Sequence, residues 1–139
     1  MPNFSGNYEH TLDQKNRLQL PAEFRADLGE IFCAYIPLDR SAFIQLMTQE
    51  SFDAMVREFM ERYADNRAKQ RDGKRIIYRN MEKLTQDKQG RITLSDRFCR
   101  RAKLEAKAKI VGVDDFVEIC HPDLYSDEAL DNDFDGSGF

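Results

Sequence analysis

The stretch DQKNRLQL at residues 13–20 returns, in modified form, as DKQGRITL at residues 87–94. Asp, Arg and the final Leu stand at the same positions in both copies, and a Phe follows each copy at the same distance, as Phe24 and Phe98. An internal repeat defines the structural unit of a chain. This repeat therefore predicts two copies of one small unit, each about half of the 139-residue chain.

Each copy has the pattern of a β-hairpin followed by a short helix. Leu18 and Leu20 alternate with polar residues, which is the period of a half-buried strand. A helix is expected over residues 21–28, where Pro suits the first turn and Gly follows the last. Its counterpart is expected over residues 95–102, with Ser95 as the N-cap.

The loop between the two strands of each hairpin is polar and has a specific turn chemistry. Asn16 aligns with Gly90, and both residue types tolerate a positive φ. Asp13 and Asp87 stand at the loop entry, where a carboxylate can accept hydrogen bonds from backbone N–H groups about two residues on. We therefore expect two tight loops with the same internal bracing.

Further strands are expected in pairs, at residues 32–36 and 43–46 in the first copy and at residues 109–113 and 116–119 in the second. Residues 48–63 have apolar side chains at spacings of three and four, which predicts the longest helix. Residues 64–74 are charged and are interpreted as a linker, and the first strand of the second unit is expected within residues 75–84. The predicted domains are a first unit at 1–63, a charged linker at 64–74, a second unit at 75–126 and a disordered acidic tail at 127–139.

The charge of the chain is unevenly distributed. The formal net charge is -4, but residues 121–139 contain six acidic residues and no Lys or Arg, so residues 1–120 have a net charge of +2. A monomer with a net charge near zero is a poor binder of DNA, because affinity depends on phosphate neutralisation. Units of about 60 residues are also marginally stable alone. Both arguments favour a homo-oligomer in which identical loops are clustered.

The cysteines and the hydropathy pattern indicate in which cellular compartment the protein is expected. Three cysteines, Cys33, Cys99 and Cys120, stand in no paired spacing and are interpreted as reduced, buried thiols of a cytoplasmic protein. No apolar run approaches the roughly 20 residues that a membrane-spanning helix needs. The sequence therefore predicts no membrane association.

The sequence contains few features that would indicate an enzyme. With His10 and His121 as the only histidines, no convincing nucleophile–base pair can be nominated. Glycine motifs for phosphates or dinucleotides are absent, as are Cys and His residues at zinc-binding spacing. We expect no catalytic residues, no metal and no cofactor. A third class, a protein-interaction scaffold that docks partners on the helix at residues 48–63, stays open.

A resemblance to a known family rests on several sequence motifs. The chain resembles the MraZ family in EHTLDQKNRL at 9–18, LPAEFR at 20–25, DKQGRI at 87–92, VGV at 111–113 and FVEI at 116–119. The resemblance extends from residue 4 to about residue 125. The chain departs from the usual family pattern at Asn16, Ser95, Phe52 and Cys120.

The resemblance implies an α+β fold of two tandem β-hairpin units of the SpoVT-AbrB, swapped-hairpin type. The two units would be related by a pseudo-twofold axis and would form a small barrel-like core with flanking helices. It also implies a cytoplasmic, nucleoid-associated transcriptional regulator that assembles into rings. Such a regulator binds direct repeats of double-stranded DNA in the promoter of the division and cell-wall gene cluster, with repression as the favoured direction.

The candidate site residues belong to the two loops. We expect DNA contacts from four cations, Lys15, Arg17, Lys88 and Arg91, and loop bracing from Asp13, Asn16, Asp87 and Gly90. A β-ribbon can enter the major groove, where Arg to guanine is the commonest specific contact. Lys suits guanine or phosphate.

Structural alternatives exist for these residues. Arg17 and Asp13 are four residues apart across a turn, and their ion pair could serve only to close the loop. Arg91 is the weaker candidate, because Gln89 stands where the first copy has Lys15. The helix edge formed by Arg97, Arg100 and Arg101 is interpreted as solvated rather than phosphate-binding, and His10 as packed or hydrogen-bonded.

Overall fold

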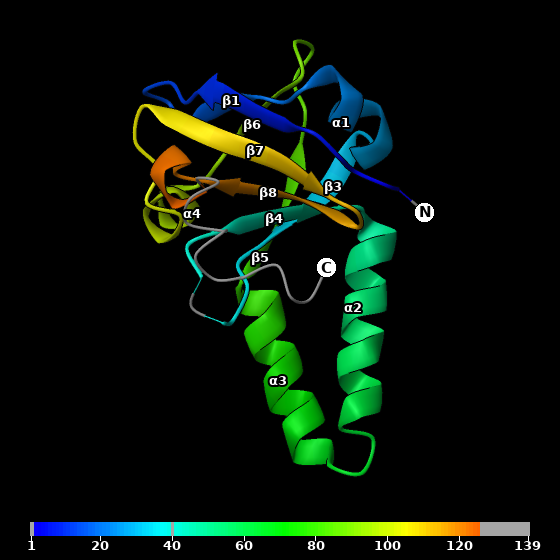
Figure 1. The fold of residues 1–139 in the computed structure, drawn as a ribbon. Coiled ribbons are helices and arrows are strands. Elements are labelled where there is room, and N and C mark those ends of the chain that lie inside the picture. Colours follow the sequence, from blue (N-terminus) through cyan, green and yellow to red (C-terminus); the bar gives the residue numbers. More distant parts are fainter. Residues whose placement is uncertain (1, 40, 126–139) are drawn as a thin grey trace, which may run out of the picture.

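The computed structural model describes residues 2–39 and 41–125 (Figure 1). The elements of the first copy are β1 (Asn7–Thr11), β2 (Arg17–Gln19), α1 (Ala22–Leu28), β3 (Ile31–Tyr35), β4 (Ile44–Met47) and α2 (Gln49–Arg62). The next helix is α3 (Arg67–Arg79). The elements of the second copy are β5 (Met81–Thr85), β6 (Arg91–Thr93), α4 (Asp96–Arg101), β7 (Lys107–Val113), β8 (Phe116–Cys120) and a 3-10 turn, η1 (Pro122–Leu124).

The strands form one six-stranded antiparallel sheet, in the order β1-β7-β8-β4-β3-β5, and a two-stranded ribbon of β2 and β6. The counterparts of β1, β3 and β4 in the second copy are β5, β7 and β8. When each strand is exchanged for its counterpart, the sheet has the same order, counted from the opposite edge. The registers are also equivalent, since Asn7 pairs with Val111 where Met81 pairs with Tyr35. The α+β fold and the pseudo-twofold relation of the two copies are confirmed, although the sheet stays open between β1 and β5.

The predicted hairpins form their turns, but their strands pair across the two copies. Within the first copy, β1 and β2 form no ladder with each other; an isolated bridge joins Leu12 to Leu18 just after β1, and β1 itself pairs with β7. In the ribbon, Leu18 lies opposite Ile92, and both side chains are almost fully buried. Burying such a side chain contributes roughly 1.5–3 kcal/mol, which favours the crossed arrangement over two separate hairpins.

A common core joins the two copies. Phe24 of α1 and Phe98 of α4 occupy equivalent positions in it, and each is no more than 2% exposed. The ring of Phe24 contacts Phe4 and Tyr8 edge-on, with centroids 5.7 and 5.4 Å apart. The three cysteines are free and buried, and within the described residues they form no disulfide.

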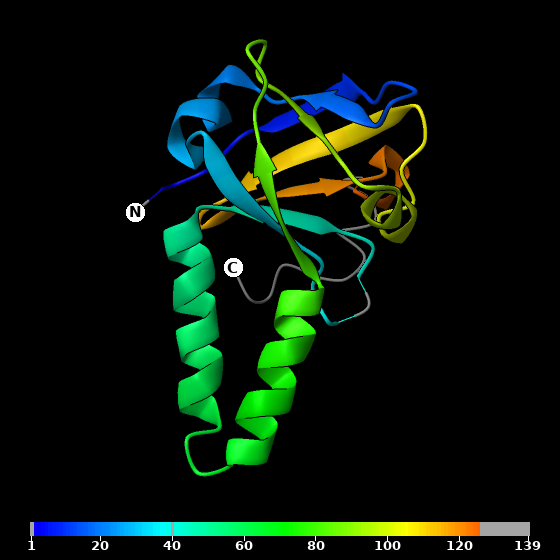
Figure 2. The same ribbon diagram turned by 180° about the vertical axis from the view of Figure 1, so that it is seen from behind.

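Helices α2 and α3 lie side by side and extend away from the sheet, at the end of the molecule opposite the β5–β6 loop (Figures 1 and 2). Residues 64–74, which were interpreted as a linker, lie mostly within α3, which covers residues 67–79, and the strand expected within residues 75–84 begins only at Met81. Asn66 caps this helix by accepting a hydrogen bond from the Lys69 N–H at 3.0 Å. Only Ile77 of α3 is buried, so the sequence contains almost no apolar periodicity to mark the helix.

Strands of the two copies interleave in one sheet, so the sheet itself does not divide the chain into separate domains. The domain boundaries at 1–63 and 75–126 stay a prediction. The acidic tail predicted for 127–139 lies outside the described residues. Among residues 2–39 and 41–125, no helix is long and apolar enough to cross a membrane.

Candidate nucleic-acid interface

The first loop is organised by the carboxylate of Asp13. Its Oδ1 accepts hydrogen bonds from the backbone N–H of Lys15 at 2.9 Å and of Arg17 at 2.8 Å. Its Oδ2 accepts from Nε of Arg17 at 2.7 Å. Asn16 has a φ of 61°, which allows the chain to turn back within the loop. One side chain thus fixes the backbone and the direction of the arginine.

The second loop repeats this arrangement almost atom for atom. Oδ1 of Asp87 accepts from the backbone N–H of Gln89 and Arg91, both at 2.9 Å, and Oδ2 accepts from Nε of Arg91 at 2.8 Å. Gly90 has a φ of 77°, as its alignment with the first loop predicts. Two separate stretches of sequence therefore present the same braced arginine.

The hydrogen bonds within the loops stabilise the charged form of each aspartate. The backbone N–H of Arg17 makes the largest contribution and lowers the pKa of Asp13, and the side chain of Arg17 lowers it further. Arg91 lowers the pKa of Asp87 in the same way and the same order. Both carboxylates are therefore charged at neutral pH, and each holds its arginine side chain at one atom.

The Asp–Arg pair that was expected as a structural alternative is present in both loops, but it occupies only Nε of each arginine. Among the described residues, neither terminal nitrogen of Arg17 or Arg91 makes a hydrogen bond, and 35% and 31% of these side chains are exposed. The outer edge of each guanidinium can thus bind a ligand while the brace stays intact. Lys15 and Lys88 are exposed beside them.

Each loop is held in place by residues of the other copy. The side-chain amide of Asn16 donates to Oδ1 of Asp96 at 2.7 Å, and the backbone oxygen of Asn16 accepts from Leu94 N at 2.9 Å. At the second loop, the backbone oxygen of Gln89 accepts from Gln19 Nε2 at 2.7 Å and from Arg25 Nη1 at 3.3 Å.

Sequence reasoning missed these supporting residues. Asp96, Gln19 and Arg25 lie 64 to 80 positions from the loop residues that they contact, and no local pattern indicates such a pairing. His10 does have the hydrogen-bonded role expected for it, with Nδ1 at 2.6 Å from the backbone oxygen of Gln19.

The basic edge of α4 is only partly solvated. Arg97 is exposed, as expected, but it also donates to the backbone oxygen of Arg79 at 2.7 Å and to Oδ1 of Asn80 at 2.5 Å. Arg101 lies within 3.5 Å of the backbone oxygen of Pro37. Arg97 thus connects α4 to the C-terminal end of α3.

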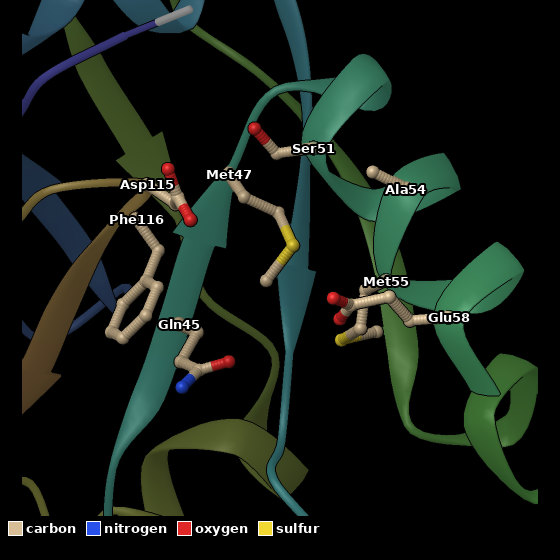
Figure 3. A pocket seen from close by; sticks show the side chains of 8 residues that line it. All are labelled: Gln45, Met47, Ser51, Ala54, Met55, Glu58, Asp115 and Phe116. Atoms are coloured by element: carbon tan, nitrogen blue, oxygen red, sulfur yellow. The ribbon is translucent and has the colours of Figure 1, made fainter. Parts of the chain in front are cut away.

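A cavity of about 360 Å³ opens between α2 and the sheet, away from both loops (Figure 3). The side chains of Met47 and Met55 face each other across it. Ser51 supplies a hydroxyl group, but that group accepts a hydrogen bond from the N-cap residue Thr48 at 3.1 Å. The lining also includes the carboxylates of Glu58 and Asp115, but no His, Cys or Lys, so the cavity offers apolar contact area with acidic groups beside it.

Comparison with known proteins places this sequence in a family. The model of the family described as "MraZ protein, putative antitoxin-like" matches residues 3–72. The chain is 37% identical, over 117 residues, to a protein of Mycoplasma mobile named transcriptional regulator MraZ, with 82% of this chain and 76% of that protein covered. Proteins of the same name from Carboxydothermus hydrogenoformans (33% over 123 residues; 88% and 84% covered) and Mycoplasmopsis pulmonis (31% over 135 residues; 91% and 89% covered) are also similar. The chain belongs to the MraZ family.

Proposed function

We propose that this protein is a sequence-specific DNA-binding transcriptional regulator that reads DNA with its two Asp-x-x-x-Arg loops. Membership of the MraZ family and the names of its relatives support regulation of transcription as the broad function. The observation that supports the loops as the reading surface is their shared geometry. In both, a carboxylate fixes the backbone and one atom of an arginine, and the other end of that arginine is available.

In this mechanism, the bracing reduces the loss of conformational freedom on binding, because the arginine is already held in one direction. Arg17 and Arg91 use their outer nitrogens for guanine in the major groove, where two parallel hydrogen bonds discriminate one base pair from the others. Lys15 and Lys88 neutralise nearby phosphates and supply affinity that depends on salt. Asp13 and Asp87 act on the loops and do not contact the DNA.

The proposal includes assembly of identical chains into a ring. One chain contributes few cations to DNA, but several copies on repeated sites gain effective concentration. We further propose that the sites are direct repeats in the promoter of the division and cell-wall gene cluster, that the protein represses transcription there, and that it acts in the cytoplasm at the nucleoid.

Light scattering on the purified chain at micromolar concentration tests the assembly. We expect an oligomer larger than a dimer. A monodisperse monomer would contradict the ring and, with it, the argument from effective concentration.

Capture of genomic fragments by the purified protein at moderate salt, followed by sequencing, tests the function. We expect enrichment of a repeated promoter element by the parent chain. A variant with both Arg17→Ala and Arg91→Ala is the matched control, and it should lose the enrichment while keeping the circular dichroism spectrum of the parent. Equal enrichment by both proteins would show that the reading surface lies elsewhere.

A second candidate, a protein-interaction scaffold, is favoured by the apolar cavity beside α2. Under that hypothesis, substitution of Met55 by a charged residue abolishes the activity in cells and the loop substitutions leave it intact. The DNA-binding proposal expects the opposite ranking, so transcription of the cluster in cells with each variant separates the two.

A further inference from the structure

Helix α3 has a strongly basic face that the loop mechanism does not use. Four arginines recur at every fourth position, which places them along one side of the helix, and Lys74 lies on the same side. All five side chains of this basic face are exposed: Arg67, Arg71, Lys74, Arg75 and Arg79. The other side of α3 packs against α2, where Gly73 leaves room for the ring of Phe59 and Gln70 donates to the Met60 oxygen at 2.8 Å.

The charge of this face is poorly compensated among the described residues. Asp72 is the only acidic residue of α3, and it lies 3.3 Å from Nε of Arg71 and 3.9 Å from Nη1 of Arg75. These pairs are exposed, and exposed pairs contribute little. With six basic residues and one acidic residue, α3 has a net charge of +5.

The described chain ends near the C-terminal end of this helix. The ring of Tyr125 contacts Phe43 edge-on at 6.1 Å, just before β4 begins. In the sheet, Gln45 of β4 pairs with Tyr35 of β3, and Tyr35 pairs with Met81 of β5. Met81 is the first residue of β5, the strand that directly follows α3. Neighbouring strands are about 4.8 Å apart, so roughly 10 Å of sheet separates β4 from the strand that follows α3.

We propose that residues 126–139 of the same chain dock on the basic face of α3. This segment contains five acidic residues, Asp127, Glu128, Asp131, Asp133 and Asp135, and no Lys or Arg, so its charge of -5 matches that of the helix. Fourteen extended residues span roughly 46 Å. The 13 residues of α3 span about 20 Å, so the segment is long enough to cover the entire face.

The position of α3 favours the chain's own acidic segment over DNA as the occupant. The helix lies at the opposite end of the molecule from the β5–β6 loop, so it is remote from DNA that this loop contacts (Figures 1 and 2). A segment tethered nearby also has a high effective concentration at the helix. Docking would cover cations that otherwise attract any DNA sequence, and it would leave the loops as the main DNA contact.

Zero-length cross-linking of the full-length protein tests the docking without DNA. A carbodiimide joins carboxylates to lysines with which they form ion pairs, and mass spectrometry then locates the joined residues. We expect Lys74 to be joined to acidic residues of 126–139, and we expect the product to disappear in about 1 M salt, where the Debye length falls to about 3 Å. Lys69 is a control on the same helix, since it lies on another side and contacts the ring of Tyr63 at 5.2 Å.

Products at Lys15 or Lys88 in place of Lys74, or no product at all, would overturn the proposal. Mixing chains of normal and heavy isotope content distinguishes docking within one chain from docking on a neighbouring copy. Docking within one chain gives no product that joins a normal to a heavy chain, so a large share of such mixed products, about half in an equal mixture, would overturn docking within the chain. The variant Arg71→Gln/Arg75→Gln keeps Lys74 and should lower the yield severalfold.

A binding titration gives a second readout. Deletion of residues 127–139 should raise affinity for scrambled duplex DNA by about threefold or more, because the basic face becomes free. In the Arg71→Gln/Arg75→Gln background the same deletion should have little effect. An equal rise in both backgrounds would show that the segment acts elsewhere. The cross-linking result does not depend on DNA binding, so failure of this proposal can be distinguished from failure of the proposed function.

Discussion

The loops at residues 13–17 and 87–91 share their bracing but differ in the residues around it. Both have an aspartate that accepts two backbone N–H groups and one arginine Nε, with matching distances. The first loop has Lys15 where the second has Gln89. The brace is therefore what the turn requires in either copy, whereas the lysine stands one position earlier in the second loop, as Lys88. We infer that the first loop makes the larger contribution to DNA binding.

Removal of each arginine is the strongest test of this inequality. Arg17→Ala should weaken binding to specific sites by roughly 1–3 kcal/mol per engaged loop and reduce the preference over random DNA, because a bidentate base contact is lost. Arg91→Ala should have the smaller effect. Titrations on operator and scrambled DNA measure both. Arg57→Ala, which removes an exposed arginine from α2, is the matched control and should leave the preference unchanged.

Two results would contradict this prediction. If Arg17→Ala bound operator DNA like the parent, the pair with Asp13 would be structural only. If it unfolded the protein, as seen by circular dichroism, the ion pair would be the better explanation of the repeated motif.

The turn residues give the next largest effect, on stability. Gly90→Ala should lower the free energy of unfolding by about 1–2 kcal/mol, because an L-residue with positive φ is strained. A Cβ atom there would also lie 2.2 Å from Nη1 of Arg25, which would have to move. Asn16→Gly keeps the backbone relaxed and loses only the exposed bond to Asp96, so it should change stability by less than about 1 kcal/mol. Chemical denaturation compares the two, and equal losses would show that the second loop is not constrained by its glycine.

Substitution of the loop lysines should lower the affinity for all DNA sequences by a similar factor. Lys15→Ala is expected to lower affinity for operator and scrambled DNA by a similar factor and to reduce the slope of log affinity against log salt by about 1. Lys88→Ala tests whether a lysine one position earlier in its loop reaches phosphate equally well. Titrations at two salt concentrations measure these slopes. A selective loss on operator DNA would instead assign Lys15 to a base.

The smallest expected effect is on acid stability. The pKa of Asp13 and Asp87 is lowered in the folded protein, so each contributes stability above the ordinary aspartate value of 3.8. That contribution is lost as the pH falls below 3.8 and through the folded pKa. Asp13→Asn and Asp87→Asn should each make stability less dependent on pH in this acidic range. Thermal denaturation from pH 5 downward measures the slope, and a difference between the two variants would show that the braces are not equivalent.

Local chemistry explains which features could be predicted from the sequence. The positive φ at Asn16 and Gly90 follows from which residue types tolerate that conformation. The start of α4 was predictable because Ser95 caps it by accepting a hydrogen bond from the N–H of Phe98, three positions on. Helix α3 was missed because its stability does not depend on an apolar stripe that a sequence pattern would reveal.

By itself, the sequence determined the two copies, their loops and their short helices, because these depend on residues a few positions apart. Only the tertiary structure decided that β2 pairs with β6, that Asn16 is held by Asp96, and that Arg97 binds the end of α3. These contacts join residues far apart in the chain, and many alternative pairings satisfy the same local patterns. Burial of Leu18 against Ile92 favours one of them, because both apolar side chains leave water only when the two copies cross.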